Sequence, residues 1–137
     1  MSTKIFYAAA GMGRKVRAPA LVASDGFSAR YDLDRIAGIF SRPEHKLAGE
    51  SYCGRVLVLD AAKGGVATAW MLHEMNARGV VPAALVLNRA NPIMVQGAAL
   101  AGLTMISDFG LDITKAIPTG AEVEVDPTGE RPFIRVL

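Results

Sequence analysis

A lysine followed by two glycines, Lys63, Gly64 and Gly65, could bind an anionic group of a substrate. These residues follow an apolar run at 56–59, which favours a strand buried on both faces, and they precede a segment with helical spacing. Such a turn places free backbone N–H groups and the positive end of a helix dipole at one point. We therefore expect Gly64 and Gly65 to bind a carboxylate, with Lys63 as its counter-charge. The alternative is a plain connection with a solvated lysine, and the spacing does not match a Walker A loop.

Two hydroxyl groups flank this turn in the sequence. Thr68 stands one turn into the expected helix, where it could orient substrate or relay a proton, with Lys63 as the nearby activating group. A threonine in that position can instead bond a carbonyl group back along the helix. Ser51 stands just before the central strand and could bind substrate or cap a turn.

Polar residues also follow the next apolar run, at 83–87. Asn88, Arg89 and Asn91 would lie at the carboxyl end of that strand, where open α/β sheets bind ligands. Arg89 could pair with a carboxylate, or it could be a solvated loop arginine. Asn91 is also a plausible N-cap, because Pro92 follows it at the first helical position.

The remaining reactive side chains do not favour a metal site. Cys53 is the only cysteine, which leaves no internal disulfide and no pair of cysteine ligands. Two histidines, His45 and His73, do not make a zinc site by themselves. We expect His45 in an exposed loop, His73 on the apolar face of a helix, and Cys53 as a small buried residue.

The composition predicts one compact domain over residues 1–137. Hydrophobic residues make up 51% of the 137 residues and charged residues 20%, which suits a packed core. The net charge of +2 gives no reason to expect nucleic-acid binding, although Arg14, Lys15 and Arg17 form a small basic group. No signal pattern or membrane-length apolar run is visible, so we expect no membrane contact and a cytoplasmic location.

The elements that would position these residues follow an alternating order in the middle of the chain. Strand, helix, strand, helix and strand are expected at 56–59, 66–77, 83–87, 92–101 and 103–106, with Val66, Trp70, His73 and Ala77 on one face of the first helix. Strands at 5–8 and 18–23, separated by a loop, precede this unit, and a hairpin at 121–125 and 132–136 follows it. Segment 27–50 has no dominant period and is expected to be a functional or interface-forming loop. The fold class is mixed α/β, with a central βαβαβ unit closed by β-rich termini.

Two blocks of sequence resemble one protein family. The run HKLAGES at 45–51, ahead of GRVLV at 54–58, is similar to the small subunit, or swivelling domain, of the aconitase X family. The run PAALVL at 82–87 and the ANPI at 90–93 resemble that family's next strand and its Ala-Asp-Pro turn, with Asn91 in place of the aspartate. The similarity spans roughly residues 16–126, with both blocks in the family's order and spacing.

This resemblance implies a β/β/α swivelling domain like the mobile domain of aconitases. It also implies the small subunit of a two-subunit hydro-lyase, inactive without an aconitase X-type large subunit. Family members dehydrate small hydroxy acids, namely cis-3-hydroxy-L-proline and, in archaeal relatives, phosphomevalonate, and the first is the expected substrate here. The iron–sulfur cluster or metal would belong to the large subunit, with no cofactor in this chain.

One departure from the family concerns the turn after the central strand. The family's turn is roughly Gly-Arg-Gly-Ser, and its serine is thought to abstract the proton. Aligning the strands puts Lys63 at the arginine, Gly64 at the second glycine and Gly65 at the serine. Either another group such as Thr68 does this work, or the chemistry differs, or the chain is a non-catalytic binding or regulatory swivel module.

Overall fold

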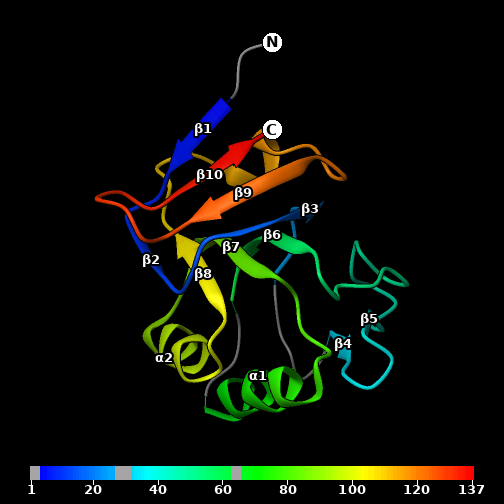
Figure 1. The fold of residues 1–137 in the computed structure, drawn as a ribbon. Helices are drawn as coiled ribbons and strands as arrows, with labels where there is room; N and C mark the ends of the chain where they lie inside the picture. Colours follow the sequence, from blue (N-terminus) through cyan, green and yellow to red (C-terminus); the bar gives the residue numbers. More distant parts are fainter. Residues whose placement is uncertain (1–3, 27–31, 63–65) are drawn as a thin grey trace.

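The computed structural model describes residues 4–26, 32–62 and 66–137, with the backbone alone for 66–69. Figure 1 shows a sheet of strands with the two longer helices packed beneath it. The strands are β1 (Lys4–Tyr7), β2 (Ala10–Met12), β3 (Val16–Val22), β4 (Leu33–Asp34), β5 (Ile39–Phe40), β6 (Val56–Ala61), β7 (Ala84–Arg89), β8 (Thr104–Ser107), β9 (Glu122–Asp126) and β10 (Phe133–Val136). The helices are α1 (Val66–Arg78), α2 (Pro92–Leu100) and α3 (Ile113–Ala116).

The main sheet has eight strands in the order β1-β10-β9-β3-β6-β7-β8-β2. Strands β3, β6, β7 and β8 are parallel, and the other pairings are antiparallel. The two edge strands, β1 and β2, are joined by only Ala8 and Ala9, so the sheet must curl until its edges meet. The Ala8 N–H donates to the Pro132 carbonyl oxygen over 2.8 Å, and the Ala9 N–H donates to that of Asp108 over 2.7 Å. The predicted mixed α/β class, with a βαβαβ unit closed by terminal strands, is confirmed.

Alternation along the parallel strands builds two cores. On β6, Val56 and Val58 face the inside of the curled sheet, whereas Leu57 and Leu59 face α1 and α2. All four side chains are fully buried, as the uninterrupted apolar run predicts. Burying a leucine side chain stabilises the fold by about 1.5–3 kcal/mol, so this strand anchors both layers.

The predicted buried face of α1 is wrong. Trp70 is 66% exposed, its ring lies 6.2 Å from that of His73, and both His73 and Ala77 are exposed. The buried residues are instead Leu72 and Met75, which lie in the core beneath the sheet. Both faces of this helix carry apolar side chains, so periodicity alone selects the wrong one.

Strand β2 lies in a segment expected to be a loop. It pairs with β8, more than ninety residues away, and the chain then turns at Gly13, where φ is +104°. A Cβ at Gly13 would lie 2.7 Å from the Thr104 Cα. The Thr104 hydroxyl group donates to the Arg14 carbonyl oxygen over 2.7 Å, and the Arg14 N–H donates back to that hydroxyl over 3.1 Å. This close docking holds β2 where propensity would not predict a strand.

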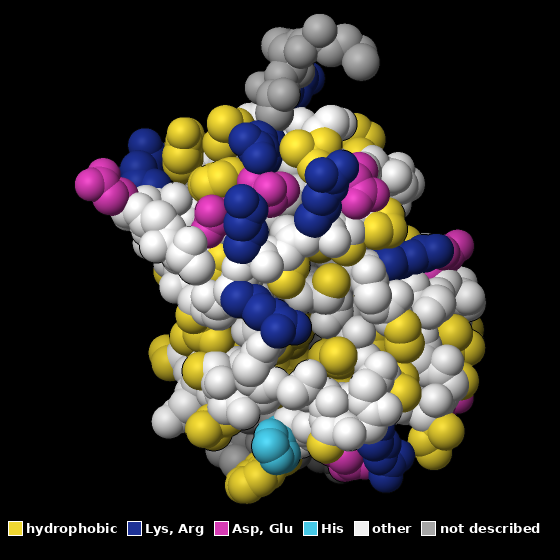
Figure 2. Space-filling view, viewed as in Figure 1, with side chains coloured by type: hydrophobic (Ala, Val, Ile, Leu, Met, Phe, Trp, Pro, Cys, Tyr) yellow, Lys and Arg dark blue, Asp and Glu magenta, His cyan; other side chains and the backbone are white. Residues whose placement is uncertain are grey.

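The outer face of β3, β9 and β10 carries ion pairs. Figure 2 shows basic and acidic side chains side by side on the upper part of this face. Arg17 lies 3.6 Å from Glu122, and Glu124 lies 3.6 Å from Lys15 and 2.6 Å from Arg135. The basic group found in the sequence is therefore mostly matched by acidic neighbours on β9. None of the helices in the described part of the chain is long and apolar enough to cross a membrane.

Candidate functional site

The four parallel strands end at one edge of the sheet, and each end carries a carboxylate or an amide. Asp25 follows β3, Asp60 lies near the end of β6, Asn88 near the end of β7, and Asp108 follows β8. The carboxyl edge of a parallel sheet is the usual place for a ligand. We refer to this set of strand ends as the carboxyl edge.

The predicted anion-binding turn joins this edge to α1. Lys63, Gly64 and Gly65 lie outside the described residues. Thr68 lies in the first turn of α1, and its side chain also lies outside the description. The described part of the site therefore consists of the strand ends that lie beside this turn.

Asn88 ties two carboxylates together. Its Nδ2 donates to Asp60 Oδ1 over 3.0 Å and to Asp112 Oδ1 over 2.9 Å. Its Oδ1 accepts a hydrogen bond of 2.8 Å from the Ile113 N–H. Every polar atom of this amide is thus used, which fixes the orientation of Asn88 and of the start of α3.

Asp112 is the N-cap of α3, and hydrogen bonds fix its side chain as well. Its Oδ1 accepts from the Thr114 N–H over 3.0 Å and from the Thr114 hydroxyl group over 2.6 Å. That hydroxyl group also lies 3.1 Å from the Ser24 hydroxyl group at the end of β3. The side-chain hydrogen bonds from Thr114 and then from Asn88 lower the pKa of Asp112, because they stabilise the carboxylate.

The Asp60 carboxylate accepts fewer hydrogen bonds from the described residues than that of Asp112. Its side chain is 46% exposed, and its Oδ2 lies 4.0 Å from Arg89 Nη2. Its backbone is fixed, since the Asp60 N–H donates to the Asp25 carbonyl oxygen over 2.8 Å. Asp60 therefore presents a carboxylate from a rigid strand.

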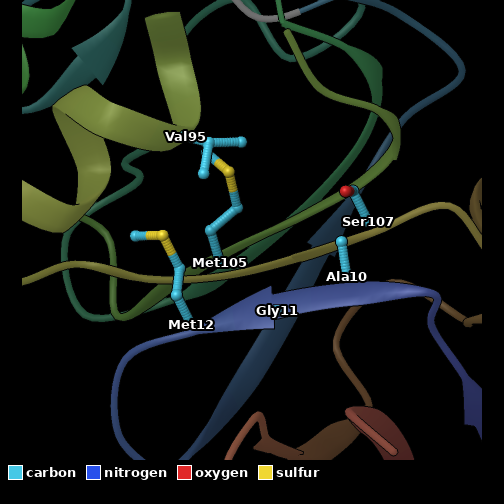
Figure 3. Close-up of a pocket in the computed structure, with 6 residues that line it drawn as sticks. All are labelled: Ala10, Gly11, Met12, Val95, Met105 and Ser107. Carbon is cyan, nitrogen blue, oxygen red and sulfur yellow. The ribbon is translucent and has the colours of Figure 1, made fainter. Parts of the chain in front are cut away.

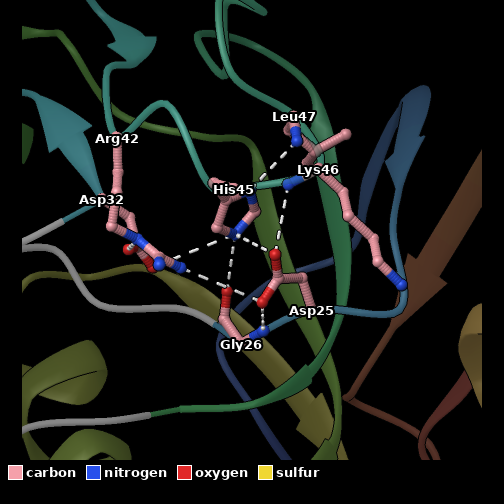
Figure 4. Close-up of polar contacts among 7 residues, drawn as sticks. All are labelled: Asp25, Gly26, Asp32, Arg42, His45, Lys46 and Leu47. Atoms are coloured by element: carbon pink, nitrogen blue, oxygen red, sulfur yellow. Dashed lines mark hydrogen bonds and ion pairs between the residues drawn. The ribbon is translucent and has the colours of Figure 1, made fainter.

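A buried histidine holds the chain that leaves β3 (Figure 4). His45 Nε2 lies 2.8 Å from the Gly26 carbonyl oxygen, and Nδ1 accepts a 3.0 Å hydrogen bond from the Leu47 N–H. These partners assign the proton of a neutral imidazole to Nε2. The ring stacks on Phe40 at 4.6 Å and its side chain has no exposed area. The expectation of an exposed loop histidine is wrong, because the fold brings the Gly26 carbonyl group, nineteen residues away, and the Phe40 ring against the imidazole.

Two aspartates and an arginine surround this histidine. Asp25 accepts hydrogen bonds from the backbone N–H groups of Gly26, over 2.8 Å, and Lys46, over 3.1 Å. The Arg42 guanidinium binds Asp32 and lies 4.0 Å from Asp25. Burial alone would raise the pKa of Asp25, but the two backbone hydrogen bonds and the neighbouring basic groups hold it below its usual value. This cluster ties segment 42–47 to the exit of β3, beside Asp60.

Two of the predicted substrate-binding residues lie at the carboxyl edge. Arg89 ends β7, and its side chain is 76% exposed. Asn91 caps α2, and its Oδ1 accepts a 2.8 Å hydrogen bond from the Met94 N–H. The predicted N-cap is confirmed. Its role in substrate binding stays a prediction.

Ser51 lies elsewhere. Its backbone bridges to Ile39, and its Oγ accepts a 3.4 Å hydrogen bond from the Cys53 N–H. The Gly54 N–H then donates to the carbonyl oxygen of Val81, which precedes β7. Ser51 is therefore near the amino ends of the strands rather than at the carboxyl edge. Its neighbour Cys53 is exposed, so the prediction of a buried cysteine is wrong.

A small pocket lies where β2 meets β8, beside α2 (Figure 3). Its volume is about 90 Å³, and its lining is largely apolar, with Met12, Val95 and Met105 around it. The Ser107 hydroxyl group donates to Asp108 over 2.8 Å. None of the described residues that line this pocket is charged, and this lining does not favour an anionic substrate. Within the described parts of the chain, no group of three or more His, Cys, Asp or Glu side chains could hold a metal ion.

Comparison with known proteins identifies the fold and the family. The solved structure of aconitase X from Thermococcus kodakaraensis superimposes with a TM-score of 0.87, at 23% identity over 98% of each chain. The solution NMR structure of a UPF0107 protein gives a TM-score of 0.82, at 24% identity over 99% of each chain. At these identities the likeness shows the fold, and it confirms the predicted swivelling domain.

Three sequence relatives share one name. The phosphomevalonate dehydratase small subunit of Methanopyrus kandleri is 35% identical over 115 residues, which is 84% of this chain and 85% of the relative. Those of Methanocella arvoryzae and Pyrococcus abyssi are each 30% identical, over 85% and 88% of this chain and 88% and 92% of the relatives. The prediction of a hydro-lyase subunit is confirmed by these relatives. The model of the aconitase X swivel domain matches residues 6–134, and this chain therefore belongs to that family.

Proposed function

We propose that this chain is the small subunit of a two-subunit hydro-lyase that removes water from a small hydroxylated carboxylate. The observation that carries the proposal is the alignment, over 84% of the chain, with a small subunit of phosphomevalonate dehydratase. The partner would be an aconitase X-type large subunit. The swivel domain would close over that subunit with its carboxyl edge, and closure would exclude water from the substrate.

Phosphomevalonate is the substrate we propose to test first. The relatives are named for it, whereas none of those described above is named for cis-3-hydroxy-L-proline, the acid expected from the sequence. Both acids carry a carboxylate and a hydroxyl group, so the same turn could bind either. The phosphate group of phosphomevalonate would require an additional cation, and the exposed guanidinium of Arg89 at the carboxyl edge is a candidate.

The roles of the individual residues follow from the sequence. Lys63, Gly64 and Gly65 would bind the substrate carboxylate, and Thr68 would orient the substrate. Arg89 and Asn91 are proposed as further substrate contacts, because both lie at the carboxyl edge. For Ser51 we propose the turn-capping role, since its Oγ binds the Cys53 N–H and its segment leads into the amino end of β6, away from the carboxyl edge.

The iron–sulfur cluster or metal implied by the family is assigned to the large subunit. There it would supply Lewis acidity at the leaving hydroxyl group. In the dehydration, this chain would bind the substrate carboxylate, orient the substrate and exclude water.

Co-expression with a cysteine-bearing large subunit tests this proposal. The complex is assayed for dehydration of phosphomevalonate and of cis-3-hydroxy-L-proline, as wild type and as Lys63→Met and Arg89→Met. Losing a charge-assisted hydrogen bond is worth about 1.5–3 kcal/mol, so KM should rise about 10- to 100-fold in each variant. The control is Arg78→Met. Arg78 lies at the C-terminal end of α1, whereas the carboxyl edge lies at its N-terminal end, and Arg78 pairs with Glu74 over 3.0 Å.

Three outcomes would contradict parts of the proposal. If no large subunit binds, the subunit assignment fails. If the complex is active and both variants match the control, the site assignment fails. If the complex forms but dehydrates neither acid, a non-catalytic or regulatory swivel module is favoured, for which the sequence supplies Gly65 at the serine position of the family.

A further inference from the structure

The carboxylates at the carboxyl edge differ in how far their oxygens are already used. Both oxygens of Asp25 accept backbone hydrogen bonds. Asp112 Oδ1 accepts three hydrogen bonds, from the Asn88 amide and from the Thr114 backbone and side chain. The described residues donate none to Asp112 Oδ2, but Asp112 caps α3 and does not lie on β6. Asp60 Oδ1 accepts only the 3.0 Å bond from Asn88, and no hydrogen bond from another described residue reaches its Oδ2. Asp60 therefore has an oxygen available to a ligand.

Asp108 Oδ2 accepts a hydrogen bond from the Ser107 hydroxyl group, and no described residue donates one to its Oδ1, but Asp108 lies on another strand end. It follows β8, and β7 separates it from β6. Neighbouring strands lie about 4.8 Å apart, so two spacings put Asp108 about 10 Å from β6. Asp60 stands on β6 itself, three residues ahead of the proposed carboxylate-binding turn. Of the two, only Asp60 is on the strand that leads into the turn.

The position of Asp60 is fixed by its neighbours. Its N–H is bound to Asp25 on one side, and its Oδ1 to Asn88 on the other. Asn88 is held in turn by Asp112 and by the Ile113 N–H. A carboxylate oriented in this way loses little entropy when it meets a substrate. Arg89 Nη2, 4.0 Å from Asp60 Oδ2, places a cation for an anionic substrate beside it.

A carboxylate has an advantage over a hydroxyl group as a base. A carboxylate already carries a negative charge that can accept a proton, whereas the hydroxyl group of a serine or threonine needs an activating group. The alignment of strands leaves Gly65 where the family has its serine. The chain therefore needs a base from elsewhere if it takes part in the proton transfer.

We propose that Asp60 is the group that accepts the substrate proton, an inference that rests on the proposed dehydratase function. Asp60 Oδ2 takes the proton from the carbon beside the substrate carboxylate, and the C–H electron pair becomes the carbon–carbon double bond. The C–O bond on the neighbouring carbon breaks and hydroxide leaves. Asp60 then returns its proton to the hydroxide, so the net products are the unsaturated acid and one water. Asn88 is the positioning residue for this transfer.

The test uses the complex with its large subunit and three variants. Asp60→Asn keeps the shape and the contact with Asn88 but removes the base, and Asp60→Glu keeps a base in a displaced position. Glu74→Gln is the control, an exposed carboxylate on α1 away from the carboxyl edge. General bases contribute about 10²–10⁴-fold, so Asp60→Asn should lower kcat at least about 100-fold with KM changed less than about threefold. Asp60→Glu should retain part of the rate, and Glu74→Gln should remain within about twofold of wild type.

Exchange of substrate hydrogen with deuterium from heavy water supplies a readout that a structural role would not move. Wild type should exchange the hydrogen beside the carboxylate, and Asp60→Asn should not, while both variants at 60 still form the complex. If the wild-type complex is active and Asp60→Asn keeps its rate within about threefold, the Asp60 inference alone is overturned. If the wild-type complex dehydrates neither acid, the proposed function fails and the inference fails with it.

Discussion

Asn88 Nδ2 donates a 3.0 Å hydrogen bond to Asp60 Oδ1 and so joins the ends of β7 and β6. These strands are parallel neighbours in which Leu59 pairs with Leu87. The polar residue that follows each leucine, Asp60 or Asn88, therefore lies beside the other on the adjacent strand. The same amide also binds Asp112 and the Ile113 N–H at the start of α3. One side chain thus connects the carboxyl edge with the start of α3.

Replacing Asn88 should therefore destabilise the fold. Asn88→Ala removes three hydrogen bonds and leaves the N–H of buried Ile113 without its partner, a cost of about 2–3 kcal/mol. Asn76→Ala, at an exposed site on α1, is the control and should change stability by less than about 0.5 kcal/mol. Urea unfolding of the full chain measures both. Equal midpoints for the two variants would contradict a structural role for the Asn88 amide.

Acid should weaken the contribution of Asp112. Its pKa is lowered in the folded state by Thr114 and then Asn88, so its stabilising effect is complete above the unfolded pKa and lost as the pH falls through the folded one. With an unfolded pKa of about 3.9, the stability difference between wild type and Asp112→Asn should be constant above about pH 5 and shrink below about pH 4. Unfolding curves between pH 3 and pH 7 measure it. Glu130→Gln, in the exposed turn before β10, is the control, and an identical pH dependence would contradict the prediction.

The pKa of Tyr52 is raised, whereas that of Asp112 is lowered. Its side chain is fully buried, and its hydroxyl group has no hydrogen-bond partner among the described residues. Burial, and then the charge of Cys53, raise the pKa of Tyr52 to about 12, so an alkaline absorbance titration should show one tyrosine ionising only near that pH. Tyr52→Phe keeps the edge contact with Phe40 and removes an unpaired polar atom, so thermal unfolding should show no loss and a gain of up to about 1 kcal/mol. A loss larger than that would mean that the hydroxyl group has a partner.

The elements that the sequence predicts correctly carry local signals. The strand at 56–59 is an unbroken apolar run, and α2 begins with a cap and a proline at Asn91 and Pro92. The errors come from distant contacts. His45 is buried because of Gly26, nineteen residues away, and β2 pairs with a strand near the other end of the chain. Neither relationship leaves a periodic pattern in the sequence.

The candidate site shows the same division. Lys63, Gly64 and Gly65 stand out as a motif, whereas Asp60 and Asn88 form a pair only across two strands, 28 residues apart. A signal did exist, because a polar residue ends each buried apolar run and parallel strands end at one edge. No local pattern in the sequence predicts which of these polar residues contact one another, or which of their carboxylate oxygens accept no hydrogen bond from the described residues.

The closure of the curled sheet should depend on the absence of a side chain at Gly13. Gly13 and Gly102 both have positive φ, +104° and +69°, but only Gly13 lies against another backbone, at Thr104. Gly102→Ala should cost about 1–2 kcal/mol for its conformation alone. Gly13→Ala should cost a further 1–3 kcal/mol, about what overpacking adds, since Thr104 must move. Guanidinium unfolding of the two variants measures the difference, and equal losses would contradict the close docking of β2 against β8.

Asn91 should have two separable roles. As the N-cap of α2, it should be worth about 1 kcal/mol, so Asn91→Ala loses that much stability while Asn91→Asp, which also caps, stays within about 0.5 kcal/mol of wild type. As a predicted substrate contact, it would use its amide N–H donors, which both variants lack. KM of the complex should therefore rise in both, by about 5- to 10-fold for one lost hydrogen bond, although only Asn91→Ala is less stable. Unfolding curves and kinetics on the same two proteins separate the roles, and an unchanged KM in both would restrict Asn91 to its cap.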